Sequence, residues 1–121
     1  MRVKLIRQTD SEGTNISLAM EKEYEVLTIE GDYYRILTDP DSKPYGNDPV
    51  LFEIDYFEVS DSREPEFWVT EYFEGERYSG PFVWSRYFFE DYHEGKDLVR
   101  DKFKKNIQQY YPRTWNERFS S

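Results

Sequence analysis

Residues 22–37 read KEYEVLTIEGDYYRIL, and this stretch decides the fold that the sequence predicts. Apolar and polar side chains alternate through residues 23–30, which is the pattern of a β-strand with two different faces. Gly31 supplies a tight turn because glycine tolerates positive φ. Residues 33–37 then resume the extended pattern, so the stretch predicts a β-hairpin.

The alternation divides the side chains of this hairpin between two faces. In the first strand, Tyr24, Val26 and Thr28 fall on one face, and Glu25, Leu27 and Ile29 fall on the other. In the second strand, if Tyr34 and Ile36 point inward, Tyr33 and Arg35 face solvent, and a one-residue slip would reverse this arrangement.

The segments around the hairpin carry a family resemblance. Leu18 and the pair at residues 22–23 precede the hairpin, and residues 32–36, DYYRI, place an acidic turn before two aromatics. Residues 51–59, LFEIDYFEV, read as a strand, a short 3₁₀ turn that ends in an aromatic, and a last strand. In these features residues 2–60 resemble the Src-homology-3-like (SH3-like) small barrel. The resemblance implies a small antiparallel β-barrel over this part of the chain.

The same resemblance has departures that concern peptide binding. Peptide-binding members of that fold carry a tyrosine-rich motif on the first strand, whereas residues 2–7 read RVKLIR. Ile54 stands where those members have a proline. Tyr33 and Tyr56 would be the remaining parts of a peptide groove. The resemblance therefore favours the fold and weakens an assignment to recognition of proline-rich peptides.

The second half of the chain changes character. Residues 60–66, SDSREPE, read as a connector, and residues 67–79 predict a second hairpin around Glu-Gly-Glu. Ser85 is placed to cap a short helix, and a longer helix is expected over residues 98–110 before Pro112 ends it. Apolar side chains recur on one face of the longer helix: Val99, Phe103, Ile107 and Tyr110.

These patterns together predict an α+β fold in a single domain, residues 1–121. We expect an N-terminal SH3-like small antiparallel β-barrel at residues 2–60 and a further β-hairpin at residues 67–79. A helical extension with two helices is expected at residues 85–111. Trp115 and Phe119, beyond these helices, are expected to fold back onto the domain.

Composition narrows the class of function. The chain has no cysteine, which excludes disulfides, thiolate catalysis and cysteine zinc sites. No apolar run approaches the roughly 20 residues that span a bilayer, and the N-terminus lacks a signal-peptide pattern. We therefore expect a cytoplasmic protein without a membrane partner. Aromatics make up 19% of the residues, and exposed tyrosines favour protein interfaces.

Charge is strongly acidic and unevenly distributed. The formal net charge is −9, from 16 basic and 25 acidic residues. Residues 1–60 have a net charge of −7 and residues 96–113 a net charge of +4. The acidic part would repel phosphates, so direct nucleic-acid binding is not expected, whereas a basic protein partner is. The alternative, that acidity only keeps the protein soluble, stays open.

No catalytic, cofactor or metal site is expected. His93 is the only histidine, and no nucleophile, phosphate-loop or dinucleotide motif is present. Asp39 and Asp41 have the spacing of a calcium loop, but Lys43 and Pro44 occupy positions that need a ligand and a glycine. We therefore expect a protein that is not an enzyme.

The remaining hypothesis is a non-catalytic protein-binding domain. Its most concrete form is a bacterial immunity- or antitoxin-like protein that neutralises a basic toxin or nuclease. One alternative is an acidic nucleic-acid mimic of the phage type, and another is a regulatory SH3-like module that binds an extended peptide. A structural domain without separable activity is the last alternative. The predicted partner-binding residues are tyrosines and glutamates: Tyr33, Tyr45, Tyr56, Glu64, Glu66, Glu71, Glu74 and Glu76.

Overall fold

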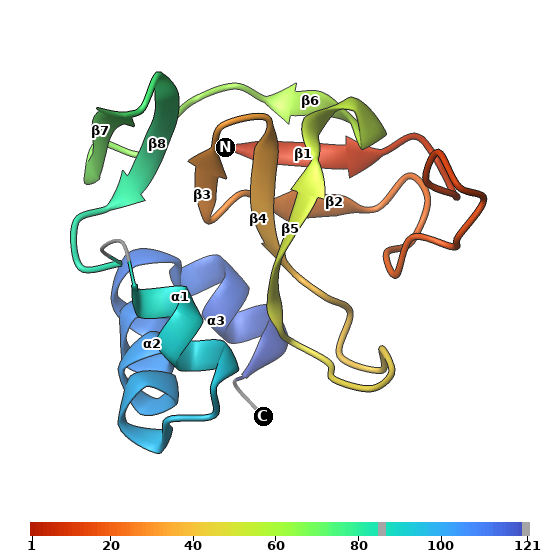
Figure 1. Cartoon of the computed structure of the whole chain (residues 1–121). Coiled ribbons are helices and arrows are strands. Elements are labelled where there is room, and N and C mark those ends of the chain that lie inside the picture. The colour runs from red at the N-terminus through yellow and green to blue at the C-terminus, as the bar shows by residue number, and fades with distance from the viewer. Residues whose placement is uncertain (85–86, 120–121) are drawn as a thin grey trace. The chain divides into compact units, whose positions relative to one another are not determined.

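The computed structural model describes residues 1–84 and 87–119 (Figure 1). The chain divides into two compact units, Met1–Gly80 and Pro81–Ser121. The first unit contains antiparallel β-sheets and the second contains α-helices, so the predicted α+β class is confirmed.

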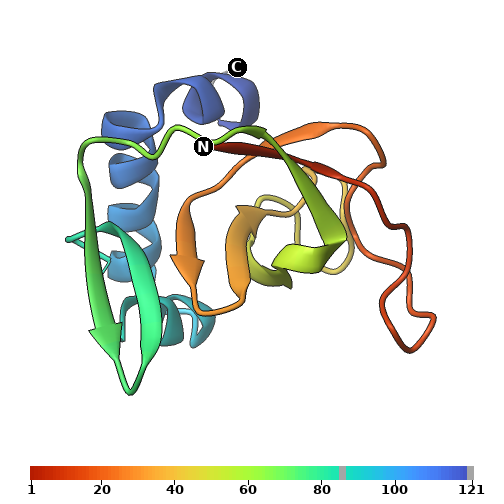
Figure 2. The ribbon, with the colours of Figure 1, turned by 90° about the horizontal axis from the view of Figure 1, so that it is seen from above.

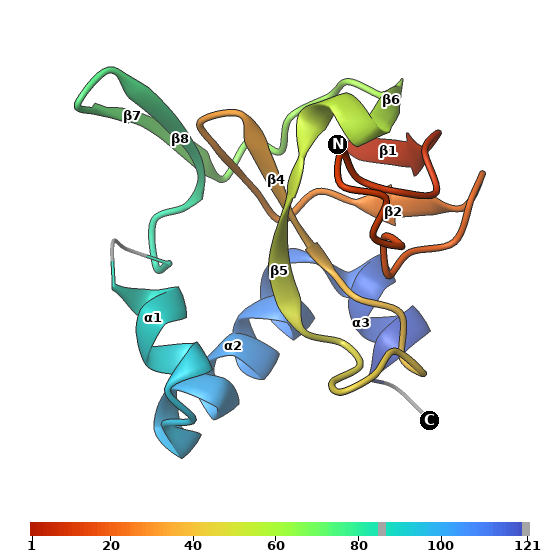
Figure 3. The same ribbon diagram turned by 45° about the vertical axis from the view of Figure 1, so that its right-hand side comes forward.

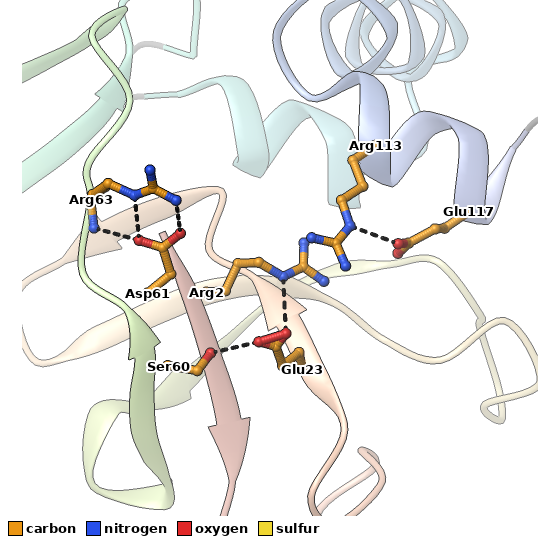
Figure 4. Close-up of polar contacts among 7 residues, drawn as sticks. All are labelled: Arg2, Glu23, Ser60, Asp61, Arg63, Arg113 and Glu117. Atoms are coloured by element: carbon orange, nitrogen blue, oxygen red, sulfur yellow. Dashed lines mark hydrogen bonds and ion pairs between the residues drawn. The ribbon is translucent and has the colours of Figure 1, made fainter.

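The first sheet has three strands in the order β2-β1-β6. These are β1 (Arg2–Leu5), β2 (Glu23–Glu25) and β6 (Phe57–Asp61), and β1 pairs antiparallel with both neighbours. Polar side chains join the three strands. Glu23 Oε2 lies 3.7 Å from Arg2 Nε, and its other carboxylate oxygen accepts a hydrogen bond from Ser60 Oγ at 3.0 Å (Figure 4).

The second sheet has five strands in the order β5-β4-β3-β8-β7. The central hairpin forms β3 (Thr28–Glu30) and β4 (Tyr33–Leu37) around Gly31, whose φ is +60°. The outer strands are β5 (Pro49–Glu53), β7 (Trp68–Phe73) and β8 (Glu76–Pro81). Figure 3 shows β4 and β5 side by side, with β1, β2 and β6 grouped apart from them.

The predicted SH3-like barrel is not supported, because the two sheets do not close on each other. The chain passes from one sheet to the other at Val26 and Leu27: the Val26 N–H donates to the Met1 carbonyl oxygen at 3.0 Å and the Leu27 N–H to the Arg35 carbonyl oxygen at 2.9 Å. As a result, β2 pairs with β1 while β3 pairs with β4. The other side of β3 pairs with β8, which extends the second sheet outward. The short 3₁₀ turn that the resemblance implies is present as η1 (Ile54–Tyr56).

Both faces of the predicted first strand contribute to the interior. Tyr24 and Val26 from one face and Ile29 from the other lie in the core cluster, and Leu27 and Thr28 are fully buried as well. Tyr34 and Ile36 both face the core. The core cluster of the first unit consists of Val3, Leu5, Ile16, Leu18, Tyr24, Val26, Ile29, Tyr34, Ile36, Tyr56, Phe57 and Trp68.

Arg35 is buried, and the prediction that it faces solvent is wrong. Its Nε and Nη2 donate to the two carboxylate oxygens of Glu30 at 2.8 and 3.1 Å, and Nη1 donates to the Pro49 carbonyl oxygen at 3.0 Å. Thr28 Oγ1 also donates to Glu30, at 2.6 Å. A buried charge is tolerated when an opposite charge and hydrogen bonds satisfy it, and Arg35 has both.

The second unit has its own aromatic core. Its helices are α1 (Phe88–His93), α2 (Asp97–Tyr110) and α3 (Pro112–Arg118). Trp84 is almost fully buried and donates from Nε1 to Asn106 Oδ1 at 3.0 Å. Aromatic rings surround its indole with centroid separations of 5.2 to 6.1 Å: Phe88, Phe89, Phe103 and Tyr111.

Three helices lie in the described part of this unit, where two were predicted. Pro112 ends α2 as expected, but it also opens α3, because proline is tolerated at the first position of a helix. Trp115 lies in this third helix and its ring contacts Phe119 at 5.4 Å. The buried face of α2 includes Phe103 and Ile107, as the apolar stripe predicts. The predicted cap, Ser85, lies outside the described residues.

Candidate partner-binding surface

The turn of the central hairpin lies beside the β7–β8 hairpin. The Gly31 backbone N–H donates to the Arg77 carbonyl oxygen at 2.7 Å. Gly31 has a positive φ of +60°, which favours glycine, and the end of the flexible, exposed Glu76 side chain lies next to it. Figure 2 shows the two hairpin turns facing the same side of the first unit. The exposed carboxylate of Glu76 therefore lies next to the turn at residues 30–32.

The 3₁₀ turn η1 approaches the other side of the same turn. The Ile54 backbone N–H donates to the Asp32 carbonyl oxygen at 3.0 Å. Tyr33 lies opposite Glu53 in the β4–β5 register. Tyr56 is hydrogen bonded to Glu53, and burial together with this carboxylate raises the pKa of the Tyr56 hydroxyl. The register of β4 and β5 thus places two tyrosines and two carboxylates at one end of the sheet.

These contacts define one continuous region, which we call the acidic turn surface. Its carboxylates are exposed, and no ion pair within residues 1–84 and 87–119 engages them. Its tyrosines differ, because Tyr33 is 41% exposed and Tyr56 only 9%. The acidic turn surface consists of Asp32, Tyr33, Glu53, Asp55, Tyr56 and Glu76.

Arginines also lie near this surface. Arg7 lies over the Tyr56 ring, 5.7 Å from its centroid, and donates from Nε to the Thr9 carbonyl oxygen at 2.8 Å. Arg35 is held by Glu30, as described above. The Arg77 Nη2 donates to both carboxylate oxygens of Glu64 at 2.7 and 2.9 Å. The charges of Arg35 and Arg77 are therefore balanced by carboxylates, whereas Arg7 adds a positive charge beside Tyr56.

The β7–β8 hairpin adds carboxylates and aromatic rings beside the acidic turn surface. Glu71 and Glu74 are exposed, and Glu74 has a φ of +52° in the two-residue turn with Gly75. Tyr72 and Phe73, which lie between them, are 72% and 53% exposed. Acidic and aromatic side chains thus alternate along the hairpin, which is a composition found at protein interfaces.

The structure brings some of the predicted site residues together and separates others. Tyr33, Tyr56 and Glu76 share the acidic turn surface. Glu64 is occupied by its ion pair with Arg77, and Glu66 is exposed in the connector before β7. Tyr45 is exposed, but its carbonyl oxygen accepts a hydrogen bond from Thr38, next to the opposite end of β4 from Tyr33. Four residue steps along this strand correspond to about 13 Å, so Tyr45 lies apart from the surface.

Sequence reasoning missed three carboxylates of this surface, Asp32, Glu53 and Asp55. Each belongs to a segment that the SH3-like resemblance had already singled out, next to Tyr33 or Tyr56. That proximity in sequence was the available signal. The pairing of Tyr33 with Glu53 depends on strand register, which the sequence alone did not specify.

The candidate calcium loop is occupied by protein groups. Asp39 Oδ1 accepts hydrogen bonds from Lys22 Nζ at 3.0 Å and from the Tyr24 hydroxyl at 2.9 Å. The described residues contain no group of three or more His, Asp or Glu side chains that could hold a metal ion. His93 ends α1, and its ring contacts Tyr92 at 5.3 Å.

Within the described residues, none of the helices is both long enough and apolar enough to span a membrane. Comparisons with protein-family models, with curated proteins and with solved structures found no significant match.

Proposed function

We propose that this chain is a non-catalytic protein-binding domain whose first unit engages a basic protein partner. One observation carries the proposal: among the described residues, exposed carboxylates without ion-pair partners lie beside exposed aromatic rings, while Arg35 and Arg77 are already paired with other carboxylates. The most concrete form of the proposal is an immunity- or antitoxin-like protein that neutralises a basic toxin or nuclease.

The distribution of charge between the two units supports this proposal. Residues 1–80 contain 8 basic and 19 acidic side chains, a formal net charge of −11. Residues 81–121 contain 8 basic and 6 acidic side chains, a net charge of +2. The first unit therefore carries the field that would steer a basic partner, and such steering weakens as salt screens it.

Recognition of an extended peptide by Tyr33 and Tyr56 has less support. The side chain of Tyr56 is largely buried and its hydroxyl is bonded to Glu53. Stacking on a peptide requires open ring area, and only Tyr33 offers it here. The alternative hypothesis, a nucleic-acid mimic, also requires an acidic surface. One outcome of the experiment below would favour it.

The test is affinity capture from a lysate of the source organism at 50 and 500 mM salt, with two matched baits. The first bait neutralises the surface with Asp32→Asn, Glu53→Gln and Glu76→Gln. The second bait neutralises exposed carboxylates outside it, with Glu21→Gln, Asp41→Asn and Glu90→Gln. Each triple variant changes the formal net charge from −9 to −6, so only the position of the lost charge differs.

We expect one basic protein to be recovered in stoichiometric amount by the wild-type chain and by the second bait at low salt. The first bait should recover this protein poorly. High salt should reduce its recovery by the wild-type chain and by the second bait. Equal loss with the two baits would contradict the proposed surface. Capture of a nucleic-acid-binding enzyme that competes with DNA for the chain would favour the nucleic-acid mimic instead.

A further inference from the structure

The strand β7 forms one edge of the five-stranded sheet. Only β8 is bonded to it among the described strands, and Figure 2 shows it as the outer strand of the hairpin. Its sequence, WVTEYF, is rich in residues that favour strands and contains neither lysine nor proline. Natural edge strands are usually protected by lysine, proline or a bulge, because an open edge can pair with another chain. Residues 68–73 have neither lysine nor proline, and Glu71 is the one charged side chain in the strand.

The turn geometry shows which backbone groups point away from β8. Glu74 and Gly75 both have positive φ, +52° and +83°, which is the type I′ turn of a two-residue hairpin. In such a hairpin, Phe73 and Glu76 form a hydrogen-bonded pair, and the pairs then alternate. Tyr72 and Thr70 consequently direct their N–H and C=O groups outward.

The side-chain contacts agree with this register. It places Thr70 opposite Ser79 in a pair without backbone hydrogen bonds, where side chains approach most closely. Thr70 Oγ1 lies 2.8 Å from Ser79 Oγ, within hydrogen-bonding distance. Thr70 is exposed and Tyr72 is 72% exposed, so both residues lie at the surface of the described part of the chain.

The carboxylates around β7 indicate which charge a strand that pairs with this edge would carry. Glu66 precedes β7, Glu71 lies within it and Glu74 follows it, whereas the hairpin's arginine is bound to Glu64. A second copy of the chain would bring the same carboxylates against each other, with a net charge of −11 on each first unit. Like charges on neighbouring strands are unfavourable, and opposite charges are favourable.

We propose that the free edge of β7 binds an extended basic segment of the partner as an additional strand. This inference rests on the proposed function and specifies its mode of recognition. The backbone of Thr70 and Tyr72 supplies the hydrogen bonds of the new ladder. Because side chains alternate, every second residue of the bound segment lies beside Glu71 and Phe73, and lysine or arginine suits these positions. The residues between them lie beside Thr70 and Tyr72, where β-branched side chains fit.

Synthetic peptides test this mode on the unaltered full chain. The first probe is Lys-Val-Lys-Thr-Lys-Val-Lys, and the control is Lys-Pro-Lys-Pro-Lys-Pro-Lys, which keeps all four lysines but cannot continue a ladder. Binding is followed by amide chemical shifts in a ¹⁵N-labelled protein. We expect the first probe to bind at least tenfold more tightly than the control and to shift the amides of Thr70 and Tyr72.

Two variants of Tyr72 distinguish the contribution of its backbone N–H to peptide binding from that of its ring. Tyr72→Pro removes the outward N–H group, and proline is tolerated on the free side of an edge strand. Tyr72→Val removes the same ring and keeps the N–H. We expect the preference for the first probe to be lost in Tyr72→Pro and retained in Tyr72→Val, with the remaining amide spectrum showing that both variants are folded.

The outcomes distinguish this inference from the proposed function. Equal affinity for the two peptides would overturn strand addition, and salt-dependent binding of both would still agree with an acidic binding surface. Failure of both peptides to bind would also overturn strand addition, while the capture experiment would continue to decide the proposed function. Equal effects of the two Tyr72 variants would show that the ring, rather than the ladder, carries recognition.

Discussion

Replacing Glu30 with glutamine is expected to destabilise the first unit because it leaves the buried Arg35 guanidinium without its counter-charge. The Arg35 side chain is only 8% exposed and the Glu30 side chain is 26% exposed. Removing one partner of a fully buried pair costs about 3–5 kcal/mol. Solvent reaches Glu30, and glutamine can still accept one hydrogen bond, so we expect a lower cost of about 2–3 kcal/mol.

A double-mutant cycle isolates the interaction between these two side chains. Arg35→Met removes the cation and one hydrogen bond to the Pro49 carbonyl, at an expected cost of about 1–2 kcal/mol. The double variant should cost less than the sum of the single variants by about 1–2 kcal/mol, because neither charge is then left unpaired. The free energy of unfolding is measured by urea denaturation followed by circular dichroism.

The exposed pair formed by Arg113 and Glu117 provides a matched control. Its Nε–Oε1 distance is 3.1 Å, but its side chains are 62% and 49% exposed. Glu117→Gln should change the free energy of unfolding by no more than about 0.5 kcal/mol. If Glu30→Gln costs as little as Glu117→Gln, or if the two single costs add in the double variant, the argument from burial is wrong.

Three further predictions concern pKa values and backbone geometry. Burial, with Glu30 nearby, raises the pKa of the Tyr78 hydroxyl above its ordinary value of 10.0. The free energy of unfolding should therefore fall as the pH rises above about 10, and the fall should be smaller in Tyr78→Phe. Hydrogen bonds from the side chain and backbone of Arg63 hold the pKa of Asp61 well below its usual range (Figure 4). In an NMR titration, Arg63→Gln should move the Asp61 pKa back toward its ordinary value, and an unchanged midpoint would contradict this cause. Gly31→Ala and Gly75→Ala should each cost about 1–2 kcal/mol because both glycines have positive φ. The two costs should be similar, because the Glu76 carboxylate near Gly31 ends a flexible, exposed side chain that can move aside. Thermal unfolding measures both variants, and unchanged stability in either one would contradict the strain of positive φ.

Local patterns in the sequence predicted several elements because the forces that specify them act over a few residues. The alternation around Gly31 predicted the central hairpin, and the turn at Glu74 and Gly75 predicted the second hairpin. The apolar stripe through Phe103 predicted the longer helix. The positive φ of Gly31 and Gly75 agrees with the two predicted turns, and the buried Phe103 and Ile107 agree with the predicted stripe of the helix.

Tertiary pairing decided the features that the sequence analysis missed. The pairing of β3 with β8 joins Ile29 to Ser79, fifty residues further along the chain, and extends a sheet where a closed barrel was predicted. Arg35 is buried because Glu30 and Pro49 receive its hydrogen bonds, and no alternation of polar residues shows such partners in advance.

The same distinction applies to the candidate surface, because the sequence predicted some of its features and tertiary contacts produced the others. Counting charges along the chain is enough to show that the first 80 residues are strongly acidic, and the composition led to tyrosines and glutamates as candidates for binding. Which side chains lie together depends on the folded chain. Strand register places Glu53 opposite Tyr33, and the hydrogen bond from the Gly31 N–H to the Arg77 carbonyl oxygen joins the two hairpins, because both contacts form between residues far apart in the chain.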